Sequence, residues 1–118
     1  MKENIKKGRL GESIAEEYLV KSGYRIIEKN WHYSRNAEID IIAAEGSTLV
    51  FIEVKTRSSF EYGAPAQAVN TIKKRHILSA SKNYILKNQI KNTFIRFDIV
   101  EVFVENYNFK INHIKQII

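Results

Sequence analysis

Apolar residues recur at helical spacing in two segments of the chain. In the first, over 11–22, Ile14 and Tyr18 lie on one face, and Gly23 follows where the end of a helix favours glycine. The second segment begins near Pro65, which suits a first helical turn, and its apolar stripe continues into the high eighties. The pattern predicts two amphipathic helices.

Alternating and β-branched apolar residues mark most of the remaining chain as strands. Gly46 and Ser47 form a two-residue pair that favours a tight hairpin between two of them. The predicted strands are 24–33, 37–45, 48–56, 93–104 and 109–117. The order α-β-β-β-α-β-β predicts an α/β fold, with a mixed central β-sheet flanked by helices. No linker divides the chain, so we expect one domain over 1–118.

Composition excludes several classes of protein. The 118 residues are 44% apolar and 27% charged, as in ordinary globular domains. Cysteine is absent, which excludes disulfides and thiolate metal sites. No apolar run is long enough for a membrane span or a signal peptide, so we expect a cytoplasmic protein without membrane contact. The net charge of +6 and the pI near 9.6 favour a polyanionic partner such as nucleic acid.

Candidate chemistry lies on the predicted hairpin. A two-residue turn sets a register in which Asp40 lies opposite Glu53. In the same register Glu38 lies opposite Lys55, and all four side chains emerge on one face. The other face is expected to carry Ile39, Ile41, Ile52 and Val54.

Two directly opposed carboxylates destabilise a strand pair unless a proton or a cation neutralises them. Mg²⁺ or Mn²⁺ suits such a site, because hard divalent cations take oxygen ligands and Mg²⁺ commonly uses one or two carboxylates plus a substrate phosphate. Lys55, two residues after Glu53, could position the attacking water. The pattern predicts phosphodiester hydrolysis.

These residues resemble a known superfamily. Asp40, followed by Glu53-Val54-Lys55 on the next strand, is similar to the PD-(D/E)XK nucleases, which include restriction enzymes and archaeal Holliday-junction resolvases. Nearly the whole chain resembles the YraN-like family of bacterial proteins. The segments that carry this resemblance are Gly11-Glu12, Ala37-Glu38-Ile39-Asp40, Phe51 to Arg57, Ala68-Val69 before Lys73, and Arg96 to Val100. The resemblance implies a restriction-endonuclease-like fold.

The resemblance also implies roles for individual residues. Asp40 and Glu53 would bind the metal ion, and Lys55 would be the catalytic lysine. Glu12 would be a further acid and metal ligand from the first helix. Ala37 departs from the family pattern, which usually has glycine there, but leaves every proposed ligand in place.

Several residues have competing interpretations. Trp31 and Tyr33 could stack on bases, but packing is the favoured interpretation. Asp98, between apolar neighbours, is interpreted as a hydrogen-bonded structural acid. Glu38 is interpreted as forming a surface ion pair with Lys55. Polar residues near the site could bind phosphates, although such a charge run is often only solvated surface; these are Gln67, Lys73, Lys74, Arg75 and Arg57.

The sequence therefore supports three hypotheses. The first is a nuclease that depends on Mg²⁺ or Mn²⁺ and is either an endonuclease or an exonuclease. Its substrate would be nucleic acid, with DNA favoured over RNA, and could be branched or damaged DNA. The alternative is a nucleic-acid-binding module with a vestigial nuclease site that assists recombination or repair. The third is a protein-interaction scaffold. A homodimer would suit a nuclease that cuts both strands.

Overall fold

The computed structural model describes residues 2–35, 37–58 and 71–118, and the side chains of 8–35, 37–58 and 74–118. The elements follow the predicted order. They are α1 (Lys2–Lys21), β1 (Arg25–Ser34), β2 (Ala37–Glu45), β3 (Thr48–Arg57), α2 (Thr71–Lys87), β4 (Phe94–Glu105) and β5 (Asn108–Ile114). No described helix is long and apolar enough to cross a membrane.

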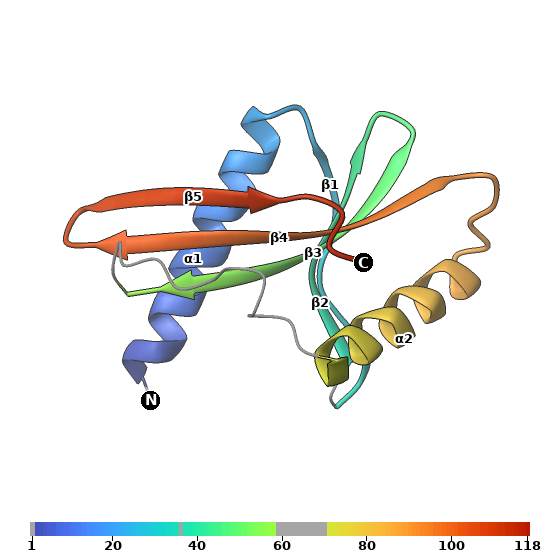
Figure 1. Ribbon diagram of the computed structural model, residues 1–118, viewed down its shortest axis with the longest axis horizontal. Helices are drawn as coiled ribbons and strands as arrows, with labels where there is room; N and C mark the ends of the chain where they lie inside the picture. Colours follow the sequence, from blue (N-terminus) through green and yellow to red (C-terminus); the bar gives the residue numbers. More distant parts are fainter. Residues whose placement is uncertain (1, 36, 59–70) are drawn as a thin grey trace.

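The strands form one mixed sheet in the order β1-β2-β3-β4-β5. β3 and β4 pair in parallel, and the other neighbours pair antiparallel. In Figure 1, β4 and β5 form a long hairpin that crosses α1, whereas α2 lies beside β2. β3 therefore occupies the centre of the sheet, and it carries two of the predicted catalytic residues.

Alternation along β3 sends its apolar side chains into two separate cores. Phe51 packs in the core that contains Tyr84 of α2. Ile52 packs in the core that contains Leu19 of α1. Because neighbouring residues of a strand point to opposite faces, the two helices cover opposite faces of the sheet. Burial of each such side chain contributes about 1.5–3 kcal/mol, which fixes β3 between the two layers.

The helices differ from the prediction more than the strands do. α1 begins at Lys2, well before the predicted start at residue 11. Residues 2–10 are mostly good helix formers with few apolar side chains, so hydrophobic periodicity does not reveal them. α2 ends at Lys87, in agreement with the prediction, whereas the predicted start near Pro65 lies outside the described residues.

The hairpin register is confirmed where β2 and β3 pair. The ladder joins Ile41–Glu45 to Thr48–Ile52 in the predicted register and stops before Asp40. Ile39 packs in the core with α2, whereas Ile41 packs in the core with α1. The prediction that Ile39 and Ile41 share a face is therefore wrong, because the alternation along β2 is interrupted at the point where its pairing with β3 ends.

Candidate active site

A surface pocket of about 410 Å³ lies where α1 meets β2 and β3. Glu12 reaches it from α1, Asp40 from β2, and Glu53 and Lys55 from β3. The remaining lining residues are Gly8, Val54 and Thr56. The structure thus brings together the four residues that the sequence predicted for catalysis.

Glu12 reaches the pocket because α1 passes close to β3. A Cβ atom on Gly11 would collide with the hydroxyl group of Thr56 on β3, so only glycine permits this approach. One and two turns further along α1, Ala15 and Leu19 are fully buried against the sheet. The packing of the helix therefore fixes where Glu12 lies. Sequence spacing alone could not have selected Glu12 among the acids of this helix.

A backbone group of the neighbouring strand holds Asp40 in place. Asp40 Oδ2 accepts a hydrogen bond of 2.8 Å from the Val54 N–H. The carboxylate lies just beyond the last pair of the β2–β3 ladder, where it takes the place of a backbone acceptor. Among the described residues, Oδ1 has no hydrogen-bond partner and is available to a ligand.

The pocket contains more negative than positive charge. Burial raises the pKa of Asp40 to about 8, and the nearby carboxylate of Glu53 adds to the shift. Burial also raises the pKa of Glu12, with further contributions from Glu38 and Glu53. Both acids therefore bind a proton or a cation more readily than isolated carboxylates do.

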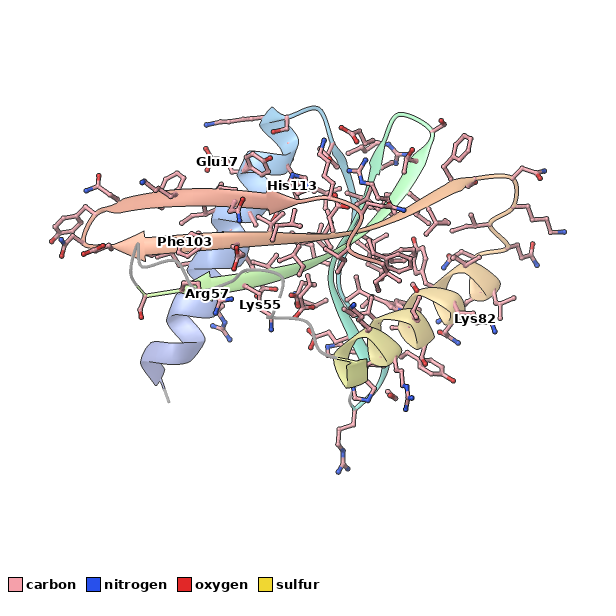
Figure 2. The ribbon with its side chains drawn as sticks, in the orientation of Figure 1. Glu17, Lys55, Arg57, Lys82, Phe103 and His113 are labelled. Atoms are coloured by element: carbon pink, nitrogen blue, oxygen red, sulfur yellow. The ribbon has the colours of Figure 1, made fainter. Side chains whose placement is uncertain are left out.

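Lys55 is the cation that lies within this acidic group. Its Nζ is 3.6 Å from Oε1 of Glu53, and the side chains are 30% and 8% exposed, respectively. The carboxylate is thus part of the pocket wall, whereas the ammonium group reaches solvent. Figure 2 shows Lys55 and Arg57 on the same strand, β3. Lys55 is positioned to contact a water molecule or a phosphate oxygen at the pocket.

Glu38 has a different partner from the one predicted. It pairs with His32 in the β1–β2 ladder, and its Oε1 lies 3.6 Å from His32 Nε2. The predicted opposition to Lys55 is wrong, because the ladder between β2 and β3 ends before Glu38. Glu38 nevertheless adds negative charge near the pocket and raises the pKa of Asp40.

Arg57 binds a buried acid that the sequence analysis did not single out. Its Nε and Nη2 donate hydrogen bonds of 3.2 and 3.1 Å to Oε2 of Glu101, which is 1% exposed. Asn112 donates a hydrogen bond to the other carboxylate oxygen. A charged residue inside the apolar run 99–104 was the available signal, because a buried charge needs a partner.

The other predicted nucleic-acid contacts lie on or before α2. Lys74 is half-buried and Arg75 is exposed, and neither forms an ion pair with a described acid. The side chain of Lys73 and the whole of Gln67 lie outside the described residues. Lys74 and Arg75 are therefore open to contact with a phosphate group.

The prediction for Asp98 is confirmed, because this acid is buried and fully hydrogen-bonded. It accepts hydrogen bonds from Arg96 Nη2 at 2.9 Å and from the Gln116 N–H at 3.1 Å, and it contacts His113 Nε2 at 2.8 Å. Arg96 also binds Glu45. Although burial raises it, the hydrogen bonds from His113 and Arg96 leave the pKa of Asp98 below its ordinary value. Asp98 is part of the structural framework and not of the pocket.

The chemistry of the pocket acids determines which metal ion they suit. Among the described residues, no three His, Cys, Asp or Glu side chains form a ready group of ligands. The donors present are carboxylate oxygens, which suit Mg²⁺ or Mn²⁺. Mg²⁺ commonly needs only one or two protein carboxylates when water and phosphate complete its shell. The donor chemistry and the excess of acid therefore fit a hard divalent cation.

Comparison with solved structures identifies the fold. The structure is similar to Hjc, a Holliday junction resolvase from Archaeoglobus fulgidus, with a TM-score of 0.50 and 17% sequence identity. The similarity covers 87% of this chain and 71% of that chain. The predicted restriction-endonuclease-like fold is confirmed.

Comparison with sequences identifies the family. Residues 11–102 match the model described as "Uncharacterised protein family UPF0102". A UPF0102 protein of Alkaliphilus oremlandii is 45% identical over 114 residues, covering 95% of this chain and 97% of the relative. One from Clostridioides difficile is 41% identical over 111 residues, covering 94% and 95% of the two chains. The chain belongs to the UPF0102 family, as the YraN-like resemblance implied.

Proposed function

We propose that this protein is a metal-dependent nuclease that hydrolyses phosphodiester bonds in nucleic acid, with DNA favoured over RNA. The supporting observation is the pocket in which Glu12, Asp40 and Glu53 lie beside Lys55. The chain as a whole has a net charge of +6. A concentration of acid on a basic protein suits a site that binds a cation and a polyanion together.

Asp40 and Glu53 would hold the cation, Mg²⁺ or Mn²⁺, and Glu12 would be a further acid beside it. When bound, the ion polarises the phosphate and lowers the pKa of a water ligand. The hydrogen bond from Val54 orients Asp40 for this role and leaves Oδ1 free to bind the metal ion. Burial restricts the rotation of Glu53. Both carboxylates are thus already oriented before the substrate binds.

Lys55 would act directly on the reacting groups. Its ammonium group holds the attacking water in line with the phosphorus atom and stabilises the negative charge that develops on the phosphate oxygens. Because Nζ lies beside the Glu53 carboxylate, this positive charge stays next to the acids that line the pocket. The solvent exposure of Lys55 allows a phosphate to approach.

Branched DNA is the first substrate to test. Hjc, the protein of similar fold, is a Holliday junction resolvase. Lys73, Lys74 and Arg75 on α2, with Gln67 before it, are candidates for contacts with flanking phosphates. A homodimer would bring two such sites to the two strands of a junction.

Cleavage assays test this proposal. Labelled single-stranded, duplex and four-way-junction DNA would be incubated with the protein in Mg²⁺, Mn²⁺ or EDTA. We expect cleavage to require the metal ion and to fall on the order of 10²–10³-fold in Glu53→Gln and in Lys55→Ala. Glu17→Gln and Lys21→Ala, which alter an exposed ion pair elsewhere on α1, should cleave like wild type. Cleavage that persists in both Asp40→Asn and Glu53→Gln would contradict this site.

The second candidate is a nucleic-acid-binding module with a vestigial site. The lack of a three-ligand group within the described part of the chain favours it. This module would show salt-dependent binding without cleavage in either metal ion. The same assays therefore separate the two functions.

A further inference from the structure

A second hollow, of about 200 Å³, lies between β1 and α2. It is lined by Tyr33, Ser79, Lys82, Asn83 and Leu86. Tyr33 is 52% exposed and Leu86 is 69% exposed. Figure 2 shows Lys82 projecting from α2, well away from Lys55 on β3. The hollow is therefore separate from the acidic pocket.

An irregularity in β1 accounts for the position of Tyr33. His32 pairs with Glu38 and Ser34 pairs with Ala37, so Tyr33 is an extra residue on β1. Such a bulge leaves one residue outside the ladder and changes the direction of its side chain. The bulge therefore sets Tyr33 apart from the regular alternation of the strand.

The neighbouring aromatic residue behaves differently. Trp31 packs edge-on against Tyr84, with ring centroids 5.2 Å apart, and Lys87 Nζ lies 5.0 Å from its ring centroid. The packing prediction is thus confirmed for Trp31, whereas the ring of Tyr33 remains largely exposed. An exposed aromatic ring beside a lysine is a common platform for a nucleobase.

The segment that supplies α2 contains basic residues and no acidic ones. The segment from Tyr62 to Phe97 contains no Asp or Glu. Its Lys and Arg residues are Lys73, Lys74, Arg75, Lys82, Lys87, Lys91 and Arg96. Lys82 forms no ion pair with a described acid. Arg96 is paired with Glu45 and Asp98, so the positive charge offered to a polyanion comes from the basic residues of α2, such as Lys82.

We propose that this hollow binds an unpaired nucleotide in a single-stranded segment of nucleic acid. The Tyr33 ring stacks on the base and Lys82 contacts the adjacent phosphate. The Asn83 amide can both donate and accept hydrogen bonds at the base edge. The inference rests on the proposed function for the class of ligand, and it adds that the substrate has a single-stranded part.

Two other occupants fit the hollow less well. Its volume of about 200 Å³ lies below the roughly 300–1,000 Å³ of sites that enclose small molecules, so a strand that crosses the surface suits it better than a free cofactor. A second copy of the chain, related by a twofold axis, would place two cationic surfaces against each other. A polyanionic strand has the complementary charge.

Binding of fluorescein-labelled oligothymidylate in EDTA tests the inference without cleavage. We expect Tyr33→Ala to weaken binding roughly tenfold and Tyr33→Phe to preserve it, because the ring makes the contact. Lys82→Ala should reduce the slope of log affinity against log salt concentration by about 0.7, because it removes one contact with a phosphate group. Tyr107→Ala is the matched control, because this tyrosine is fully exposed in the turn between β4 and β5.

The outcomes separate this inference from the proposed nuclease. Wild-type affinity in both Tyr33→Ala and Lys82→Ala would overturn the inference, even if the protein cleaves DNA through Glu53. Failure of the wild type to bind oligothymidylate would also overturn it. Binding that depends on Tyr33 in a protein without nuclease activity would support the inference and refute the proposed catalysis. A change in self-association at unchanged affinity would show an interface between copies instead.

Discussion

Two groups of acids in this protein have opposite surroundings. Asp98 and Glu101 on β4 are matched by Arg96 and Arg57, which donate hydrogen bonds to their carboxylates. The acids of the pocket include Asp40, which accepts its hydrogen bond from a neutral backbone N–H, that of Val54. The β4 acids are thus buried with a cationic partner, whereas the half-buried Asp40 forms no ion pair with a described residue.

The pKa shifts of Asp40 and Asp98 have opposite directions, in agreement with these surroundings. Burial raises the pKa of Asp40 to about 8, and a second carboxylate reinforces the effect. For Asp98, hydrogen bonds from His113 and Arg96 outweigh burial and lower the pKa. A compensated acid stabilises the fold, whereas an uncompensated acid reduces stability until a ligand neutralises it. The contrast between the two groups can be measured.

The largest effect should follow from loss of the compensated acid on β4. Asp98→Asn removes the charge that balances Arg96, and we expect a loss of about 3–5 kcal/mol in the free energy of unfolding at pH 7. Because the pKa of Asp98 is lowered in the folded state, its contribution is present above about pH 4 and fades as the pH falls further. Urea titrations at several pH values measure both effects. A loss below 1 kcal/mol at pH 7 would contradict the assigned role.

Arg57→Gln should have the next largest effect, a loss of about 2–4 kcal/mol, because it leaves Glu101 buried without its cation. Glu101 is also the sheet neighbour of Lys55, so the uncompensated carboxylate would compete for that lysine and reduce cleavage. The double change Arg57→Gln with Glu101→Gln should restore both stability and activity. If cleavage remains lost in the double variant, Arg57 contacts the substrate directly.

Asp40→Asn should have a smaller effect of the opposite sign. The pKa of Asp40 is raised from 3.8 to about 8, so folding takes up a proton between these pH values and wild-type stability falls as the pH rises. In EDTA we expect the variant to be more stable than wild type, on the order of 1–3 kcal/mol at pH 8, with little difference at pH 4. Thermal melts at both pH values measure this. Mg²⁺ should stabilise wild type but not the variant.

Glu38→Gln should have the smallest effect. Its ion pair with His32 is largely exposed, so we expect a change of only about 0.5 kcal/mol or less in the free energy of unfolding. The measurement is a urea titration at pH 6 alongside Glu17→Gln, an exposed acid of α1. A loss as large as that for Asp98→Asn would show that exposure does not separate the two groups of acids.

Much of the sheet and of the pocket could be predicted from the sequence. Strand alternation and a two-residue turn are local properties, so they brought Asp40, Glu53 and Lys55 together, and these residues line one pocket just beyond the end of the β2–β3 ladder. The early part of α1 could not be predicted in this way, because its sequence contains few apolar residues at helical spacing. Glu12 could be assigned only by resemblance, since the close approach of Gly11 to Thr56 is a tertiary contact.

The remaining differences arise where one strand leaves its partner. Beyond the end of the β2–β3 ladder, the side chain of Ile39 lies on the opposite face of the sheet from the one predicted. A bulge in β1 changes the direction of the Tyr33 side chain. Neither event has a signature in the pattern of apolar and polar residues. The partners of Glu101 likewise come from distant parts of the chain, Arg57 on β3 and Asn112 on β5.

The parallel pairing of β3 with β4 also bears on the order in which the chain folds. The strands β1, β2 and β3 connect through short turns, whereas the parallel ladder joins Thr48 to Phe94 and must close a long loop. Contacts between distant residues form slowly, so we expect the three-stranded meander to precede the docking of β4 in the folding reaction. Asp40 and Glu53 both belong to this meander, so we expect the repulsion between their charged forms to affect the folding rate as well as the native state.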